Sequence, residues 1–124
     1  MTAERQRLLL IDDDAIGLMA RQALLESRGY SVLTSDNDAG ALELLKSTPI
    51  DLVISDHFLR GTTGGKVASR IKKVAPHVPV LVVSGAFRHE LPPESLEGAD
   101  QFLSKAEGPD ALLAAIASMI PPPR

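Results

Sequence analysis

The sequence predicts an α/β fold, in which a parallel β-sheet is covered by helices on both faces. Short apolar runs alternate along the chain with longer segments of helical period, and this unit occurs five times. Apolar runs of four or five residues with few charges suit strands that are buried on both faces. Strands that alternate with helices imply right-handed crossovers, and these produce a parallel sheet.

Five segments have the length and composition of buried strands. They are Leu8–Ile11, Ser31–Thr34, Leu52–Ser55, Val80–Ser84 and Gln101–Ser104. Three of the segments between and after them carry apolar residues at helical spacing, which predicts one buried stripe per helix. The stripes are Ile16, Met19, Ala20, Ala23 and Leu24 in the first helix; Val67, Ile71 and Val74 in the third; and Leu112, Ala115, Ile116 and Met119 in the last.

Residues that start or stop helices agree with this phasing. Gly29 is predicted to end the first helix in the left-handed conformation. Ser35 and Asp38 have the spacing of a capping box before the second helix. Pro109 is placed where the last helix would begin.

The segment that should form the fourth helix is the weakest unit of the pattern. Pro92 and Pro93 forbid a helix through its middle. Any helix there is predicted to be short, beginning near Pro93 and ending by Gly98.

The bulk properties predict one ordinary globular domain. The 124 residues suit a single domain, which we place at residues 1–124, with a core of about residues 6–120 and a tail at 121–124. The net charge of −3 argues against direct binding of nucleic acid. No apolar stretch approaches the roughly 20 residues of a membrane span. The N-terminus lacks the features of a signal peptide, so a cytoplasmic location is the default expectation.

Polar side chains follow four of the five predicted strands. Asp12 and Asp13 follow the first strand, Asp56 the third, and Lys105 the fifth, while Ser84 ends the fourth. Ligands of open α/β sheets bind beyond the carboxyl ends of the strands. We therefore expect these side chains to converge at one edge of the sheet.

The expected gathering of three carboxylates points to a divalent cation. Each close pair of like charges costs about 4 kcal/mol at an effective dielectric constant near 20, and Lys105 alone cannot offset that. Either a carboxyl group holds a proton or a cation binds. Magnesium suits hard oxygen ligands and commonly uses one or two carboxylates with phosphate and water. No cluster of histidines or cysteines points to zinc.

Four motifs at the strand ends resemble those of response-regulator receiver domains. The stretches LLLIDDD, DLVISD, VLVVSG and QFLSK occur in the order and near the spacing of that family. The resemblance covers essentially the whole chain. It implies a flavodoxin-like (βα)5 three-layer sandwich with a five-stranded parallel sheet in the order 2-1-3-4-5.

The resemblance also implies a role for each polar residue. Asp56 is similar to the phosphoryl acceptor and Asp13 to the direct ligand of a magnesium ion. Asp12 matches the carboxylate that acts on the metal through water, and the backbone carbonyl of Phe58 matches a further ligand.

Three further residues match groups that respond to phosphorylation. The Ser84 hydroxyl and the Lys105 ammonium match the groups that bind the phosphoryl oxygens. Phe102 stands in the place of the aromatic switch residue. For Asp14, a helix N-cap is the favoured role.

The function that follows is a receiver that a histidine kinase or phosphotransfer protein phosphorylates on Asp56 and that signals through protein contacts. It would not be an enzyme beyond its own phosphorylation and dephosphorylation. A pseudo-receiver that binds proteins without phosphorylation is the alternative. A flavodoxin-like binder of small ligands is disfavoured, because DDDAIG replaces a glycine-rich phosphate loop. Homodimerisation, the kinase, the output partner and any further domains stay open.

Departures from the family pattern qualify these expectations. Arg60 replaces a usual proline, which should loosen the loop after Asp56 and bring a cation near it. Ala106 replaces the proline after Lys105, so we predict a trans peptide bond there. The proline-broken fourth segment alters the face that normally carries signalling and dimerisation. His57 is expected at the rim of the loop.

Overall fold

A computed structural model describes residues 5–121, and its centre is a five-stranded parallel sheet. The strands are β1 (Arg7–Ile11), β2 (Ser31–Ser35), β3 (Leu52–Asp56), β6 (Val80–Ser84) and β7 (Gln101–Ser104). They are ordered β2-β1-β3-β6-β7, and every neighbouring pair is parallel. The predicted strand order is therefore confirmed, and each predicted strand agrees with the observed one to within a residue at either end.

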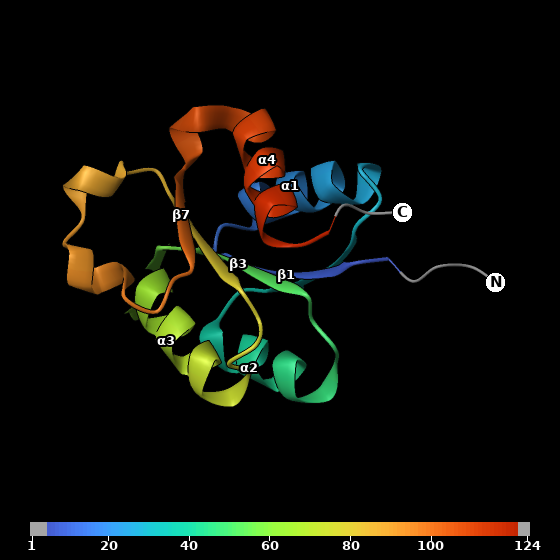
Figure 1. Ribbon diagram of the computed structural model, residues 1–124, viewed down its shortest axis with the longest axis horizontal. Helices are drawn as coiled ribbons and strands as arrows, with labels where there is room; N and C mark the ends of the chain where they lie inside the picture. The colour runs from blue at the N-terminus through green and yellow to red at the C-terminus, as the bar shows by residue number, and fades with distance from the viewer. Residues whose placement is uncertain (1–4, 122–124) are drawn as a thin grey trace.

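Four helices cover the two faces of the sheet. Helices α1 (Ala15–Ser27) and α4 (Gly108–Met119) lie on one face, and α2 (Asp38–Ser47) and α3 (Gly64–Val74) lie on the other, as Figure 1 shows. Alternate strand residues point to opposite faces. Leu8 and Ile54 thus join the core on the α1 and α4 side, whereas Leu9 and Val53 join the core on the α2 and α3 side. The predicted three-layer sandwich is confirmed.

The predicted buried face of α1 is wrong for most of its residues, although Leu24 packs against the core. Ile16 and Met19 are 81% and 68% exposed, and the helix instead buries Leu25, with Leu18 packed against the same core. Both stripes have helical spacing, so periodicity alone does not choose between them. The connection of α1 to β1 decides which stripe faces the sheet. Arg21, between Leu18 and Leu25 along the chain, has a largely buried side chain as a result.

Other helix predictions are partly confirmed. The stripe of α4 packs against the core as expected, and Gly29 follows α1 with φ 95°. In α3, Val67 and Ile71 are buried but Val74 is 48% exposed. The capping box before α2 is wrong, because the N-cap is Asn37, whose side chain accepts a hydrogen bond from the Gly40 N–H at 2.7 Å.

Two short 3₁₀ turns, η1 (Arg88–Glu90) and η2 (Pro93–Leu96), replace the fourth helix. The predicted short helical segment near Pro93 is therefore confirmed. The turn η2 packs closely on α3: a Cβ added at Gly65 would collide with the Ser95 carbonyl oxygen, and one added at Gly98 would collide with the Ser69 backbone. Glycine is needed at both positions because the two backbones nearly touch.

Replacing Gly65 with alanine is expected to destabilise the fold by about 2 kcal/mol, since overpacking of a close contact typically costs 1–3 kcal/mol. Urea unfolding would measure the loss. Gly85→Ala is the matched control, because a Cβ at Gly85 meets no atom within 4 Å. Equal stability of the two variants would contradict the close contact between α3 and η2.

Candidate functional site

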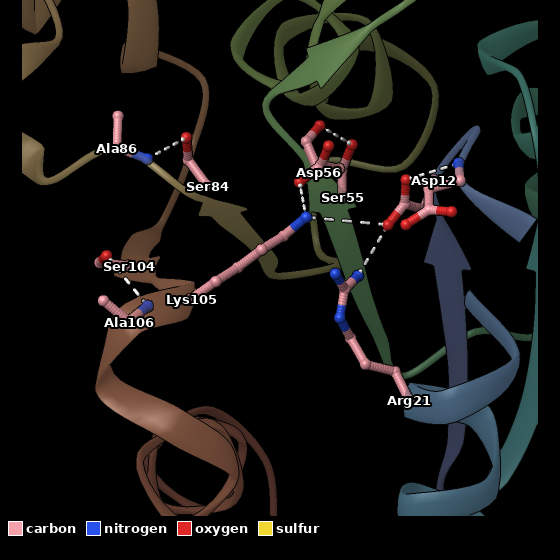
Figure 2. Close-up of polar contacts among 10 residues, drawn as sticks. Asp12, Arg21, Ser55, Asp56, Ser84, Ala86, Ser104, Lys105 and Ala106 are labelled. Atoms are coloured by element: carbon pink, nitrogen blue, oxygen red, sulfur yellow. Dashed lines mark hydrogen bonds and ion pairs between the residues drawn. The ribbon is translucent and has the colours of Figure 1, made fainter. Parts of the chain in front are cut away.

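The carboxyl ends of β1, β3 and β7 bring opposite charges together at one edge of the sheet. The Lys105 Nζ lies 2.7 Å from Asp56 Oδ1 and 3.9 Å from Asp12 Oδ2. Figure 2 shows the lysine side chain reaching from the end of β7 toward both carboxylates. The side chains of Asp12 and Asp56 are only 1% and 9% exposed. A single ammonium group thus connects two buried acids that are distant from each other in the sequence.

A second cation, Arg21, reaches the same edge from α1. Its guanidinium donates a hydrogen bond to Asp12 Oδ2 at 3.0 Å, and the Asp14 N–H donates to Asp12 Oδ1 at 2.9 Å. Arg21 is absent from the site residues predicted from the sequence. Its position could have been predicted, because Leu18 and Leu25 lie on one helical stripe and that stripe places Arg21 on the buried side of the helix.

Asp13 faces the loop after β3. That loop forms a small antiparallel hairpin of β4 (Phe58–Leu59) and β5 (Thr62–Thr63), with Gly61 at φ 75°. The Arg60 N–H donates a hydrogen bond to Asp13 Oδ2 at 2.7 Å, and Arg60 Nε lies 4.0 Å from the same oxygen. The expected loosening of this loop stays a prediction, while strand pairing and this hydrogen bond tie the loop to Asp13. The expected nearby cation is present, although it is highly exposed.

The expected single cluster of three carboxylates is not found. Within residues 5–121, no group of three or more histidine or acidic side chains could hold a metal ion by itself. Asp12 and Asp56 converge on Lys105, whereas Asp13 is bonded to the loop. Each of the three carboxylates also has its own cation: Arg21 pairs with Asp12, Arg60 with Asp13 and Lys105 with Asp56.

The remaining donor set still suits magnesium, which uses only one or two carboxylates and completes its shell with carbonyls, phosphate and water. Asp56 Oδ1 is buried and pairs with Lys105 Nζ at 2.7 Å, and within residues 5–121 it has no other hydrogen-bond donor. It is therefore an available hard oxygen ligand.

Burial raises the pKa of the Asp56 carboxyl above its ordinary value; Lys105 and Arg21 act to lower it, and the charge of Asp12 acts to raise it. Desolvation is the largest effect, so the folded protein disfavours the ionised form of Asp56.

Ser84 and Phe102 occupy adjacent strands, β6 and β7. The Ser84 hydroxyl is fully buried and accepts a hydrogen bond from the Ala86 N–H at 3.1 Å. Phe102 is half-buried and packs against the core on the α2 and α3 side. After Lys105 the chain forms a 3₁₀ turn, η3 (Lys105–Glu107), in which the Ala106 N–H donates to Ser104 Oγ. No peptide bond in residues 5–121 is cis, so the prediction for Ala106 is confirmed.

His57 is buried, at 3% exposure, so its expected place at the loop rim is wrong. Its backbone N–H bonds the Val83 carbonyl at 2.8 Å, and its ring meets Phe58 edge-on at 5.1 Å. Burial lowers the pKa of the His57 imidazole, and the negative charge of Asp56 opposes that shift. Among the described residues, 5–121, the ring atom Nδ1 has no hydrogen-bond partner.

Comparison with known proteins identifies the family. The sequence matches the family model described as "Response regulator receiver domain" over residues 8–117. The chain belongs to the response-regulator receiver family. This receiver is 36% identical over 121 residues to the transcriptional regulatory protein GlrR of Escherichia coli K12, a match that covers 94% of the receiver and 26% of GlrR. It therefore spans about a quarter of that relative.

Solved structures of other receivers share the fold. TrrA from Thermotoga maritima, solved in complex with Mg²⁺–BeF, has a TM-score of 0.84 and 26% identity, and the match covers 93% of this receiver and 99% of TrrA. TrrA solved with the histidine kinase ThkA has a TM-score of 0.83 and 25% identity, and the match covers 93% of this receiver and 98% of TrrA. A receiver domain from Clostridium thermocellum has a TM-score of 0.83 and 30% identity, and the match covers 93% of this receiver and 94% of that domain. The receiver assignment made from the sequence motifs is confirmed.

Replacing Asp56 with asparagine is expected to stabilise the folded receiver near pH 7. Since the folded-state pKa of Asp56 is raised, the stability linked to this group is fully present below its ordinary pKa and is lost as pH rises through the folded value. The amide of the Asp56→Asn variant does not ionise and would escape that loss. We expect a gain of about 1 kcal/mol, the usual scale of single substitutions, measured by urea unfolding in chelator.

The gain should disappear near pH 3, where Asp56 is protonated in both the folded and unfolded states. Glu43→Gln, within α2 and with a side chain that is 77% exposed, is the control and should change stability little at both pH values, because exposed ion pairs contribute little. A lower stability of Asp56→Asn at neutral pH would contradict the desolvation of Asp56.

Proposed function

We propose that this receiver accepts a phosphoryl group on Asp56 from a histidine kinase or phosphotransfer protein, with the help of Mg²⁺. The observation that carries the proposal is the position of Lys105 Nζ, 2.7 Å from Asp56 Oδ1 and next to Asp12. Phosphorylation on aspartate is typical of the response-regulator receiver family, which the chain matches over residues 8–117. Asp56 ends the central strand at the sheet edge where open α/β folds bind ligands.

The chemistry requires a carboxylate nucleophile and neutralisation of charge. An oxygen of Asp56 attacks phosphorus, and the bond from phosphorus to the donor imidazole nitrogen breaks as the new P–O bond forms. The product is an acyl phosphate on Asp56, and the electron pair of the broken bond leaves with the imidazole. Lys105 is close enough to Asp56 to bind a phosphoryl oxygen and stabilise the negative charge of the transferring group.

Asp13, Asp56 and the carbonyl of Phe58 would hold the magnesium ion, with Asp12 acting through water. When bound, the ion supplies positive charge that stabilises the phosphoryl oxygens. The structure of TrrA with Mg²⁺–BeF supports this part of the proposal. The β4–β5 hairpin supports it as well, because the Arg60 N–H at its tip bonds Asp13 and thereby holds that side chain near the loop that carries Phe58.

Ser84 and Phe102 would report the phosphorylation. The Ser84 hydroxyl accepts the Ala86 N–H and keeps its own proton to donate to a phosphoryl oxygen, since a hydroxyl both donates and accepts. Movement of Ser84 toward the phosphoryl group would free space near the half-buried Phe102. A local change of charge would thereby alter packing on the surface of the receiver.

The partners we propose are protein partners. The structure of TrrA with the histidine kinase ThkA supports a kinase as the phosphoryl donor. Relatives such as GlrR are transcriptional regulators. We propose no direct nucleic-acid contact for the receiver itself, because the net charge of its 124 residues is −3. Within residues 5–121 no helix is long and apolar enough to cross a bilayer. We further propose that residues 1–124 form one receiver domain in the cytoplasm. Its only chemistry would be its own phosphorylation and dephosphorylation.

A pseudo-receiver that binds proteins without phosphorylation is the second candidate. The pairing of Arg21 with Asp12, Lys105 with Asp56, and Arg60 with Asp13 favours it, because these cations already balance the three carboxylates. Phosphorylation assays separate the two functions.

Incubation with acetyl phosphate and Mg²⁺ is expected to add one phosphoryl group to the wild-type receiver, as measured by intact mass. Asp56→Asn should show no gain, because the acceptor carboxylate is absent, and Asp110→Asn should gain as the wild type does. A wild-type protein that stays unmodified would support the pseudo-receiver instead, and an Asp56→Asn variant that still gains a phosphoryl group would rule out Asp56 as the acceptor.

Lys105→Met should slow phosphorylation by acetyl phosphate about 100-fold, because removal of one group that stabilises transition-state charge commonly costs that much. The initial rate of phosphoryl incorporation would measure the loss. Lys66→Met, on the exposed face of α3, is the matched control and should keep the wild-type rate. Equal rates for the two variants would rule out a role for Lys105 in the transfer.

A further inference from the structure

Arg21 is a charged residue on the buried face of α1. Its side chain is 17% exposed, and it lines a cavity of about 220 Å³ whose walls include Leu24, Val83, Leu103 and Leu112. Long cationic side chains often lay their aliphatic stems along apolar surface. The charged end must then find a partner, because an unpaired charge away from water is very costly.

The partner is Asp12. Arg21 bonds Asp12 Oδ2 at 3.0 Å, while Lys105 Nζ lies 3.9 Å from that same oxygen. The other oxygen, Oδ1, accepts the Asp14 N–H. Both oxygens of this 1% exposed side chain are therefore engaged by the protein, and the positive charge around it comes from two elements, α1 and the end of β7 (Figure 2).

Resting on the function proposed above, we propose that Arg21 is a positioning residue that competes with Mg²⁺ for Asp12 and thereby lowers the affinity of the receiver for the metal. A magnesium ion that contacts Asp12 through a water molecule needs a carboxylate oxygen of Asp12 to accept that water, and Arg21 already binds Oδ2. The positive charge of the guanidinium also repels the incoming ion.

The field of Arg21 extends beyond its direct partner. Arg21 holds Asp12 Oδ2 at 3.0 Å, that oxygen lies 3.9 Å from Lys105 Nζ, and Lys105 pairs with Asp56 at 2.7 Å, so the guanidinium belongs to one charge cluster with both acids. Arg60 differs: it pairs with Asp13 at 4.0 Å while its side chain is 92% exposed, and exposed ion pairs contribute little. Arg21 is thus the arginine with the stronger hold on the site.

The experiment measures Mg²⁺ binding to purified wild-type and variant receivers by isothermal titration calorimetry. Arg21→Met keeps a flexible apolar side chain in the cavity but removes the charge. It should bind Mg²⁺ about tenfold more tightly, since a neighbouring charge commonly changes the proton affinity of a carboxylate tenfold or more and the same repulsion acts on a metal ion. Arg21→Lys retains the charge and should stay near the wild-type affinity. Arg70→Met, which breaks the ion pair between α3 and Asp38 of α2, should leave Mg²⁺ affinity unchanged.

A purely structural role for Arg21 predicts a different pattern. Arg21→Met and Arg21→Lys would then have lower melting temperatures than the wild type and equal Mg²⁺ affinities, and that result overturns the proposal. Should Arg21→Met fail to fold, two measurements replace it. Arg21→Gln should bind Mg²⁺ more tightly, and in wild-type receiver the ¹⁵Nε resonance of Arg21 should shift on titration with Mg²⁺. Unchanged affinity or an unmoved resonance refutes the competition.

Failure of this inference is distinguishable from failure of the proposed function. If wild-type receiver incorporates phosphoryl from acetyl phosphate but Arg21→Met binds Mg²⁺ no more tightly, only the competition is wrong. If neither protein binds Mg²⁺ and neither is phosphorylated, both are wrong. Binding of Mg²⁺ by Arg21→Met alone would support the competition and would explain a wild-type protein that resists phosphorylation.

Discussion

The contact of one lysine with two buried carboxylates is the interaction on which the site depends. Lys105 follows the edge strand β7, Asp56 ends the central strand β3, and Asp12 follows β1. Parallel pairing in register brings these three strand ends to a common edge, and their charges meet there at 2.7 and 3.9 Å. Burial makes it costly to keep these acids ionised, and it also strengthens the electrostatic interactions at the site. A desolvated carboxylate with an ammonium group beside it is prepared for a reaction in which charge develops at the same place.

The segment between β6 and β7, which begins at the same sheet edge, departs more from a regular (βα)5 pattern. Proline residues prevent a regular helix between β6 and β7, and two 3₁₀ turns take its place. Close backbone contact through Gly65 and Gly98 compensates for the missing helix by packing η2 on α3. The surface near Phe102 is therefore built from short turns where the family pattern has a helix.

Most of the fold was predictable because strand burial leaves a strong local signal. The runs at Val80–Ser84 and Gln101–Ser104 were predicted with their observed limits, and the break near Pro93 followed from the covalent geometry of proline. The face of α1 was not predictable in the same way. Apolar residues occur at helical spacing on more than one side of that helix, and only its packing on the sheet buries Leu25 and exposes Ile16.

By itself, the sequence determined the order of the secondary structure elements and the identity of the polar groups at the strand ends, since both depend on local composition and on the direction of parallel strands. The tertiary structure decided how those charges pair. Arg21 reaches Asp12 because of the rotation of α1, Arg60 bonds Asp13 because the loop after β3 forms a hairpin, and His57 is buried rather than at the rim. Ion pairing depends on side-chain positions a few ångströms apart in space, and residues distant in the chain acquire those positions only when the helices pack on the sheet.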